Sequence, residues 1–217
     1  MRIHLVTGLA LLLASCGKPA VDPASAPVAQ AARICYAAVL QQAMPPEQGR
    51  ETLSAAALLG PLFHLAIIAV QADKNGRATL ADVSDFGSDA QVGKAYRGPA
   101  LTDSLPACWQ RFPLARPGAK PAMPSDPAER GATCLYVARL APELVAASRG
   151  APDASLSAAR EIDARLSHDG GLALQIAQRY KLTSGADADA LADSIIMGTA
   201  RVGTLSAIIK ACAMARG

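Results

Sequence analysis

The amino-acid sequence predicts an all-α protein built from two similar helical halves, and three observations support this fold class. Alanine, the residue with the strongest helix propensity, occupies 48 of the 217 positions. Aromatic residues make up 4% of the chain, and alternating β-branched segments, which are typical of strands, are scarce. Two stretches of the chain also share one pattern, since each opens with a cysteine-bearing helical segment and closes with another cysteine.

Residues 1–15 are typical of a secretory signal peptide. A short basic start, Met1 to His4, precedes an apolar run of ten residues from Leu5 to Ala14. A transmembrane helix needs about 20 apolar residues, so this run is too short to span a bilayer. The run ends in Leu13-Ala14-Ser15-Cys16, which resembles the lipobox of bacterial lipoproteins. The alternative is an ordinary signal peptide followed by a chance cysteine.

The lipoprotein resemblance implies an address in the bacterial envelope. It implies cleavage before Cys16, a diacylglycerol on the cysteine sulfur and, usually, an acylated amino terminus, so the lipid bilayer is the first expected partner. An aspartate directly after the cysteine retains well-studied lipoproteins in the inner membrane, and Gly17 stands here instead. The resemblance therefore favours the outer membrane, with the protein facing the periplasm. Residues 16–28 contain three prolines and small residues, and we expect them to form a tether.

An exported chain resides in an oxidising compartment, where disulfides persist. Four cysteines remain besides Cys16, namely Cys35, Cys108, Cys134 and Cys212. An even number in an exported domain indicates two disulfides, and four cysteines allow three connectivities. Without the lipobox, the same residues would be read as four buried thiols. The sequence contains neither a CxxC pair nor a Cys/His cluster, so we expect no zinc site.

A proline-rich stretch, residues 113–127, holds five prolines and separates helical half 1 (29–112) from helical half 2 (128–217). The closing cysteine follows the opening one by 73 residues in the first half and by 78 in the second. Aligning the closing cysteines also pairs Arg97 with Arg201. This common frame favours an internal duplication, although a chance match between alanine-rich helices is the alternative. It predicts the disulfides Cys35–Cys108 and Cys134–Cys212, each joining the first and last helix of one half.

The segments between these helices read as helical hairpins or broken helices. In the first half, Thr52–Asp73 is interrupted at Gly60-Pro61 and ends in the turn signal Asp73 to Gly76. In the second half, Ser155–Tyr180 is interrupted by His168 to Gly171.

The last helix has the clearest periodicity in the chain. Ser184 is placed to cap its start, and Asp187 suits the positive end of its dipole. Apolar or small residues then recur at spacings of four and three, which predicts one continuous helical face. That face consists of Leu191, Ile195, Gly198, Val202, Leu205, Ile209 and Cys212.

The segment Leu53–Val70 has eighteen residues without formal charge. It could be a membrane span or a pair of buried helices. Gly60-Pro61 near its middle, its alanine content and the absence of a basic anchor before Lys74 favour the buried core.

Few residues indicate chemistry. His64 and His168 are the two histidines of the mature chain; we expect His64 to be a core or groove residue, with a ligand or base role as the alternative, and His168 to be exposed. Arg97 and Arg201 are candidates for an ion pair or an anion site. We expect no metal and no cofactor, because calcium-loop, P-loop, dinucleotide and haem motifs are absent.

The mature chain has a near-neutral charge of 20 − 18 = +2 after Arg2 is removed with the leader, so we expect no nucleic-acid partner. The leading functional hypothesis is a non-catalytic interaction or assembly module that binds another envelope protein. The second is a small-molecule or lipid-binding module in which Leu53–Val70 lines a cavity. The third is an enzyme that uses His64 or His168.

Overall fold

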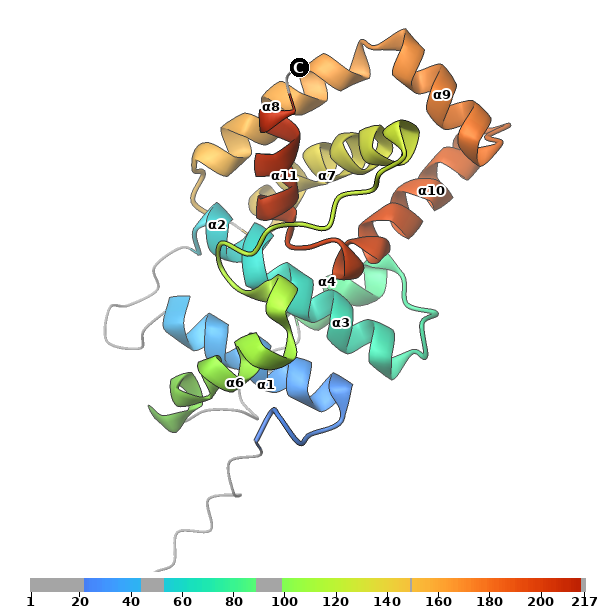
Figure 1. The fold of residues 1–217 in the computed structure, drawn as a ribbon. Helices are drawn as coiled ribbons and strands as arrows, with labels where there is room; N and C mark the ends of the chain where they lie inside the picture. The colour runs from blue at the N-terminus through green and yellow to red at the C-terminus, as the bar shows by residue number, and fades with distance from the viewer. Residues whose placement is uncertain (1–21, 44–52, 89–98, 149, 216–217) are drawn as a thin grey trace, which may run out of the picture.

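The computed structural model describes residues 22–43, 53–88, 99–148 and 150–215, and it confirms the all-α prediction (Figure 1). It is 76% helical, and the described residues contain no strand. An isolated parallel β-bridge joins Ser54 to Ala151. The predicted signal peptide, Cys16 and Arg97 lie outside the described residues.

Helices of very different length follow one another along the chain. The first half contains α1 (Val28–Ala43), α2 (Ala55–Ala57), the π-helix η2 (Leu58–Leu62), α3 (Phe63–Asp73), α4 (Leu80–Ser88), the 3-10 helix η3 (Pro99–Ser104) and α6 (Leu105–Arg111). The proline-rich stretch begins with the 3-10 turn η4 (Pro113–Ala115). The second half contains α7 (Pro127–Ala147), α8 (Ala154–Ser167), α9 (Gly170–Tyr180), α10 (Gly185–Gly198), the 3-10 turn η5 (Thr199–Arg201) and α11 (Leu205–Met214).

Short polar side chains start most helices of the second half. An N-cap oxygen accepts a hydrogen bond from a backbone N–H in the first turn, which would otherwise lack a partner. The predicted cap Ser184 does this for α10, where Asp187 completes a capping box. Equivalent caps are Asp126 of α7, Asp153 of α8, Asp169 of α9 and Thr204 of α11.

Helix α3 lies at the centre of the molecule, between α1 on one side and the second-half helices on the other (Figure 1). It contacts α1, α4 and η5, and the preceding η2 contacts α7 and α11. Leu65 and Ile67 are completely buried. The Gln71 side-chain amide donates a 2.9 Å hydrogen bond to the Met197 carbonyl of α10. This helix therefore ties the two halves into one core.

The segment Ala55–Asp73 is long and apolar enough to cross a membrane by length and composition, and 61% of its apolar window is buried inside the protein. Leu59, Leu62 and His64 are each at most 2% exposed. The expected break at Gly60-Pro61 appears as the π-helix η2, in which Gly60 has a non-helical ψ of −126°. The buried-core interpretation of Leu53–Val70 is thus confirmed.

The prediction of one continuous last helix is wrong. The chain bends by 99° between Gly185–Arg201 and Leu205–Met214. Gly203 occupies the bend with φ 148°, a backbone conformation that favours glycine, and Thr204 then caps the new helix through a hydrogen bond from the Ala207 N–H. The predicted face is consequently divided, because Leu191 belongs to a small satellite cluster with α7 and α9, whereas Leu205, Ile209 and Cys212 enter the main core.

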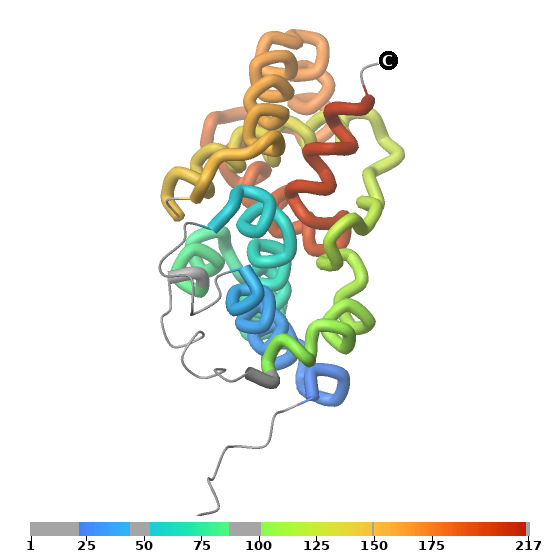
Figure 2. The backbone as a smooth tube through the Cα atoms, turned by 90° about the vertical axis from the view of Figure 1, so that its left-hand side faces the viewer, coloured from blue at the N-terminus to red at the C-terminus, as the bar shows by residue number. Residues whose placement is uncertain are grey.

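Two segments predicted as tether and linker are packed against the fold where they are described. In the first, residues 22–28, Ala26 is 5% exposed and belongs to the core, and the Arg111 guanidinium donates to the Ala24 carbonyl. In the second, Pro113–Pro127, the Ala122 N–H donates a 2.7 Å hydrogen bond to the Val202 carbonyl. Figure 2 shows this stretch running along one side of the molecule before α7 begins.

Each half has a disulfide between its own first and last helix. The two halves differ in the helices that lie between these two. In the first half, α1 packs mainly on α3, and the closing helix α6 is seven residues long. In the second, α7 packs mainly on α8, and the ten-residue α11 contacts α7, α8 and η2. One hydrophobic cluster contains residues of both halves. The internal duplication stays a prediction.

Candidate functional site

The structure forms the two predicted disulfides. Cys35 of α1 is bonded to Cys108 of α6, with their Cα atoms 5.5 Å apart. Cys134 of α7 is bonded to Cys212 of α11, with their Cα atoms 5.8 Å apart. Both separations lie in the usual range for disulfides. Each bond therefore joins the first and last helix of one half.

His64 lies inside the core. Its side chain is on α3 and the residue is 2% exposed. Burial lowers its pKa from 6.5 to about 4, although a hydrogen bond with the Gly203 backbone acts in the opposite direction. The buried Nδ1 has no hydrogen-bond partner. His64 is thus a neutral core histidine at neutral pH, and it links α3 to the bend before α11.

His168 is exposed and belongs to the end of a helix. It is the C-cap residue of α8, and its Nδ1 lies 2.7 Å from the Ala164 carbonyl oxygen. The nearby Asp169 caps α9 through the Leu172 N–H. His168 and Asp169 therefore stabilise the turn between α8 and α9.

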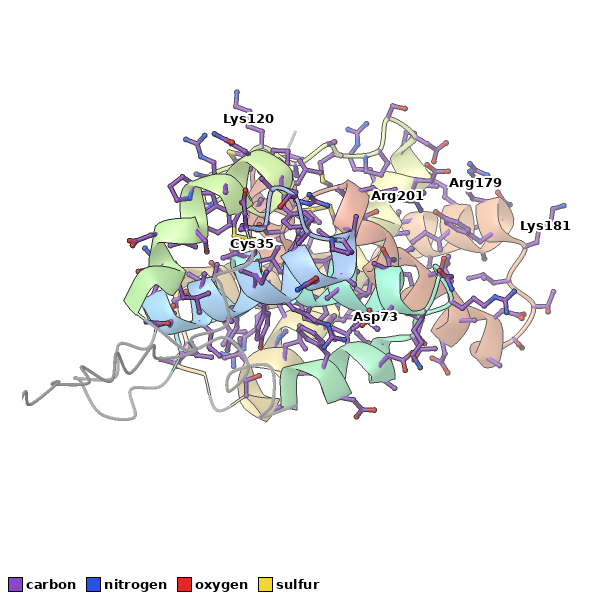
Figure 3. The ribbon with its side chains drawn as sticks, turned by 90° about the horizontal axis from the view of Figure 1, so that it is seen from below. Cys35, Asp73, Lys120, Arg179, Lys181 and Arg201 are labelled. Atoms are coloured by element: carbon purple, nitrogen blue, oxygen red, sulfur yellow. A yellow bond between two sulfur atoms is a disulfide. The ribbon has the colours of Figure 1, made fainter. Side chains whose placement is uncertain are left out.

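Arg201, the described member of the predicted arginine pair, is exposed at the end of η5 (Figure 3). It makes no ion pair within the described residues. The ion pairs of the described residues lie elsewhere: Arg33–Asp73, Lys74–Asp82, Arg139–Asp163 and Arg179–Glu129. Arg97, which the cysteine frame matches with Arg201, lies outside the described residues, so the match is not tested.

Asp73, at the predicted turn, and Asp187, at the predicted helix start, both have structural roles. Asp73 is paired with Arg33. Asp187 accepts hydrogen bonds from the Thr183 hydroxyl and from the Thr183 and Ser184 backbone N–H groups, and these lower its pKa to about 2. Across the described ranges, no three His, Cys, Asp or Glu side chains are grouped so that they could hold a metal ion.

A surface pocket of about 300 Å³ lies beside the second disulfide. Three elements form it: the proline-rich stretch, the first turns of α7 and the last turns of α11. Its lining consists of Met123, Pro124, Ser125, Arg130, Cys134, Ala211, Cys212 and Ala215. A volume of 300 Å³ is at the lower end of small-molecule sites, which span about 300–1,000 Å³. It suits a small ligand or one inserted side chain.

Hydrogen bonds hold the walls of this pocket. The Arg130 guanidinium donates to the carbonyls of Pro124 and Ser125, at 3.0 Å and 2.8 Å. Position 203 favours glycine because of its φ of 148°, and a Cβ there would lie 3.2 Å from Pro121. The close approach of Pro121 to Gly203 places residues 123–125 beside α11. An exposed cation is thus fixed on α7, one helical turn before Cys134.

The sequence hypotheses named both cysteines of this pocket but missed its other residues. The spacing of Arg130 and Cys134, four residues apart on a predicted helix, could have indicated that they share a face. The local sequence does not predict that the proline-rich stretch forms a wall of the pocket. Its contacts with Val202 and Gly203 join positions about eighty residues apart in the chain.

No family model, no curated protein and no solved structure matches this chain.

Proposed function

We propose that this protein is a lipid-anchored lipoprotein of the bacterial envelope that acts as a non-catalytic interaction module facing the periplasm. The observation that carries the proposal is the combination of Leu13-Ala14-Ser15-Cys16 with two disulfides in the folded part. The lipobox resemblance and the disulfides are independent features, and both agree with export to an oxidising compartment.

The positions of the two histidines favour an interaction module over an enzyme. His64 is 2% exposed and hydrogen-bonded to the Gly203 backbone. His168 accompanies the turn between two helices and lies against the Ala164 carbonyl. A general base must come within about 3 Å of the proton it removes. Neither histidine faces the pocket beside Cys134–Cys212, whose lining residues are different.

The burial of Leu53–Val70 also favours a binding surface over an apolar ligand cavity. Leu59, Leu62, Leu65 and Ile67, at most 2% exposed, belong to one contiguous cluster with α1 and α11 residues. Filled space of this kind stabilises the fold, because close packing gains dispersion energy. The binding of a partner would then use the outer surfaces of the helices.

Anchoring is tested by mass spectrometry and membrane fractionation of the native protein. We expect an acylated amino-terminal peptide that begins at Cys16. The variant Cys16→Ser should lose both lipid and membrane association, while the matched control Ser25→Ala, at an exposed position behind the anchor, should keep both. If Cys16→Ser is processed and fractionates like the wild type, the proposed anchoring is wrong.

The interaction role is tested by crosslinking in native membranes, followed by purification of the full-length protein. We expect the full-length protein to recover more of one envelope component than a control protein does. In the control, residues 1–28 are fused to an unrelated domain. That control separates recognition by the helical fold from the proximity that any lipid anchor creates. Equal recovery by both proteins would contradict a specific interaction surface.

A further inference from the structure

The two disulfides differ in their access to solvent. All four cysteines belong to the main core, but Cys35 and Cys108 are completely buried. Cys134 is 7% exposed and Cys212 is 2% exposed, and both line the 300 Å³ pocket. In Figure 3, Cys35 lies in the interior of the molecule. A reagent in solution can therefore approach the second disulfide through a pocket of the folded protein.

The pocket also provides a favourable charge for an anionic nucleophile. Thiol–disulfide exchange begins when a thiolate attacks a disulfide sulfur. Arg130 is exposed and lines the pocket, and its guanidinium donates hydrogen bonds to backbone carbonyls. Among the described residues, it forms no ion pair with a carboxylate. Its positive charge attracts an incoming thiolate.

We infer that the pocket beside Cys134–Cys212 is a thiol–disulfide exchange site, and that its reaction partner is a thiol reductant of the exported compartment. The thiolate enters between Ser125 and Arg130 and attacks Sγ of Cys134, the more exposed cysteine. A mixed disulfide forms with Cys134, the Cys134–Cys212 bond breaks, and Cys212 leaves as a thiolate. A second thiol of the reductant then attacks the mixed disulfide and frees Cys134. Two reductant thiols become one disulfide, and Cys134 and Cys212 become two thiols.

Reduction removes the covalent bond between α7 and α11 but leaves the apolar contacts that hold α11 in the core. Leu205, Ile208 and Ile209 remain buried in the core. In the last turn of α11, Met214 is 70% exposed, while Cys212 is buried. A 3.3 Å hydrogen bond from the Arg165 guanidinium to the Cys212 carbonyl also links this turn to the neighbouring α8. The exchange thus acts on the end of one helix and leaves the first half closed.

The test is a time course of reduction of the native full-length protein in detergent, with dithiothreitol as the probe. Newly formed thiols are alkylated with a light reagent, and the remaining disulfides are then reduced under denaturing conditions and alkylated with a heavy one. Peptide mass spectrometry gives the rate for each pair. We expect Cys134–Cys212 to be reduced at least tenfold faster than Cys35–Cys108. Equal rates, or faster reduction of Cys35–Cys108, would overturn the inference.

Two variants separate entry through the pocket from fraying of α11. Arg130→Gln removes the cation and should slow reduction of Cys134–Cys212 by about threefold or more, while Arg160→Gln, which removes an exposed arginine on α8 outside the pocket lining, should not. Ala211→Leu fills part of the pocket and should also slow the reaction. If both pocket variants react at the wild-type rate, the disulfide opens by fraying and the inferred site is wrong. Circular dichroism confirms that each variant is folded.

The source of the thiol is distinguished by two further probes at equal thiol concentration. Faster reduction by thioredoxin than by glutathione supports a dithiol protein as the partner, and reduction by glutathione alone supports a small thiol. Reduction of Cys134–Cys212 by neither probe would overturn the site. These rates are independent of lipidation at Cys16, so the inference and the proposed anchoring can fail separately.

Discussion

The two disulfides of this chain join cysteines that are 73 and 78 residues apart, but they differ in their surroundings. Both disulfides lie in the main core, but Cys35 and Cys108 are completely buried, whereas Cys134 and Cys212 also line a surface pocket. The loops that they close are almost equal in length, so the chain-entropy effect of the two bonds is almost the same. The comparison teaches that the packing of distant segments, and not the cysteine spacing, decides which disulfide is accessible.

The two histidines show the same contrast between the halves. His64 of the first half is surrounded by core residues, and His168 of the second half is exposed in a turn between α8 and α9. The first half thus contributes the central helix of the fold, and the second half contributes outer helices with polar faces. The predictions below test this difference, in order of decreasing effect.

Removal of either disulfide should lower the free energy of unfolding strongly. Removal of Cys35–Cys108 should lower it more than removal of Cys134–Cys212. The chain-entropy model gives about 4 kcal/mol for each bond. All four cysteines are in the main core, but Cys35 and Cys108 are completely buried, so replacing them by alanine should add the larger packing loss. The matched double variant replaces Cys134 and Cys212, beside the pocket. Chemical denaturation of both variants measures the difference, and a larger loss for the second pair would reverse the comparison.

Acid should destabilise the fold through His64. Its pKa is about 4 in the folded protein and 6.5 in the unfolded chain, so the unfolded state binds the proton more tightly. The contribution is fully present above pH 6.5 and is lost as the pH falls towards 4, by about 3 kcal/mol in total. We expect His64→Leu to flatten the dependence of the free energy of unfolding over this window. His168→Gln, in the exposed turn, should keep the wild-type slope, and an identical slope in both variants would contradict the assignment.

Loss of a helix cap should lower the stability less than the changes above. The loss should be larger at Thr204, at the bend in the second half, than at Ser54 in the first half. Thr204 is 4% exposed and its hydroxyl accepts from the Ala207 N–H at the start of α11. Ser54 is exposed and caps the short α2 through the Ala57 N–H. Replacement of a cap by alanine costs about 0.5–2 kcal/mol. Thermal unfolding should place Thr204→Ala near the upper value and Ser54→Ala near the lower one; equal values would mean that burial of the cap is unimportant.

Local residue patterns were sufficient to predict the helical class, the cap at Ser184 and several breaks. Ser184 and the turn from Asp73 to Gly76 act over three or four residues, so their physics is contained in the adjacent sequence. The disulfide pairing could be predicted from the common cysteine frame. His64 could be assigned to the interior because its neighbours Phe63 and Leu65 are apolar. Its hydrogen bond with the Gly203 backbone had no signal in the sequence.

The sequence by itself determined the all-α class, the cap at Ser184 and the break at Gly60-Pro61, because helix propensity, capping and turn chemistry act within a few residues. Only the tertiary structure decided that the last predicted helix bends at Gly203, that Pro113–Pro127 packs on the fold, and that a pocket lies beside Cys134. These features depend on contacts such as Ala122 to Val202, which are far apart in the chain. A continuous helix through Gly203 was locally allowed, but the bend lets Leu205 and Cys212 enter the core while Pro121 covers Gly203. The free energy gained by burying apolar surface and closing the disulfide therefore exceeds the local preference for one long helix.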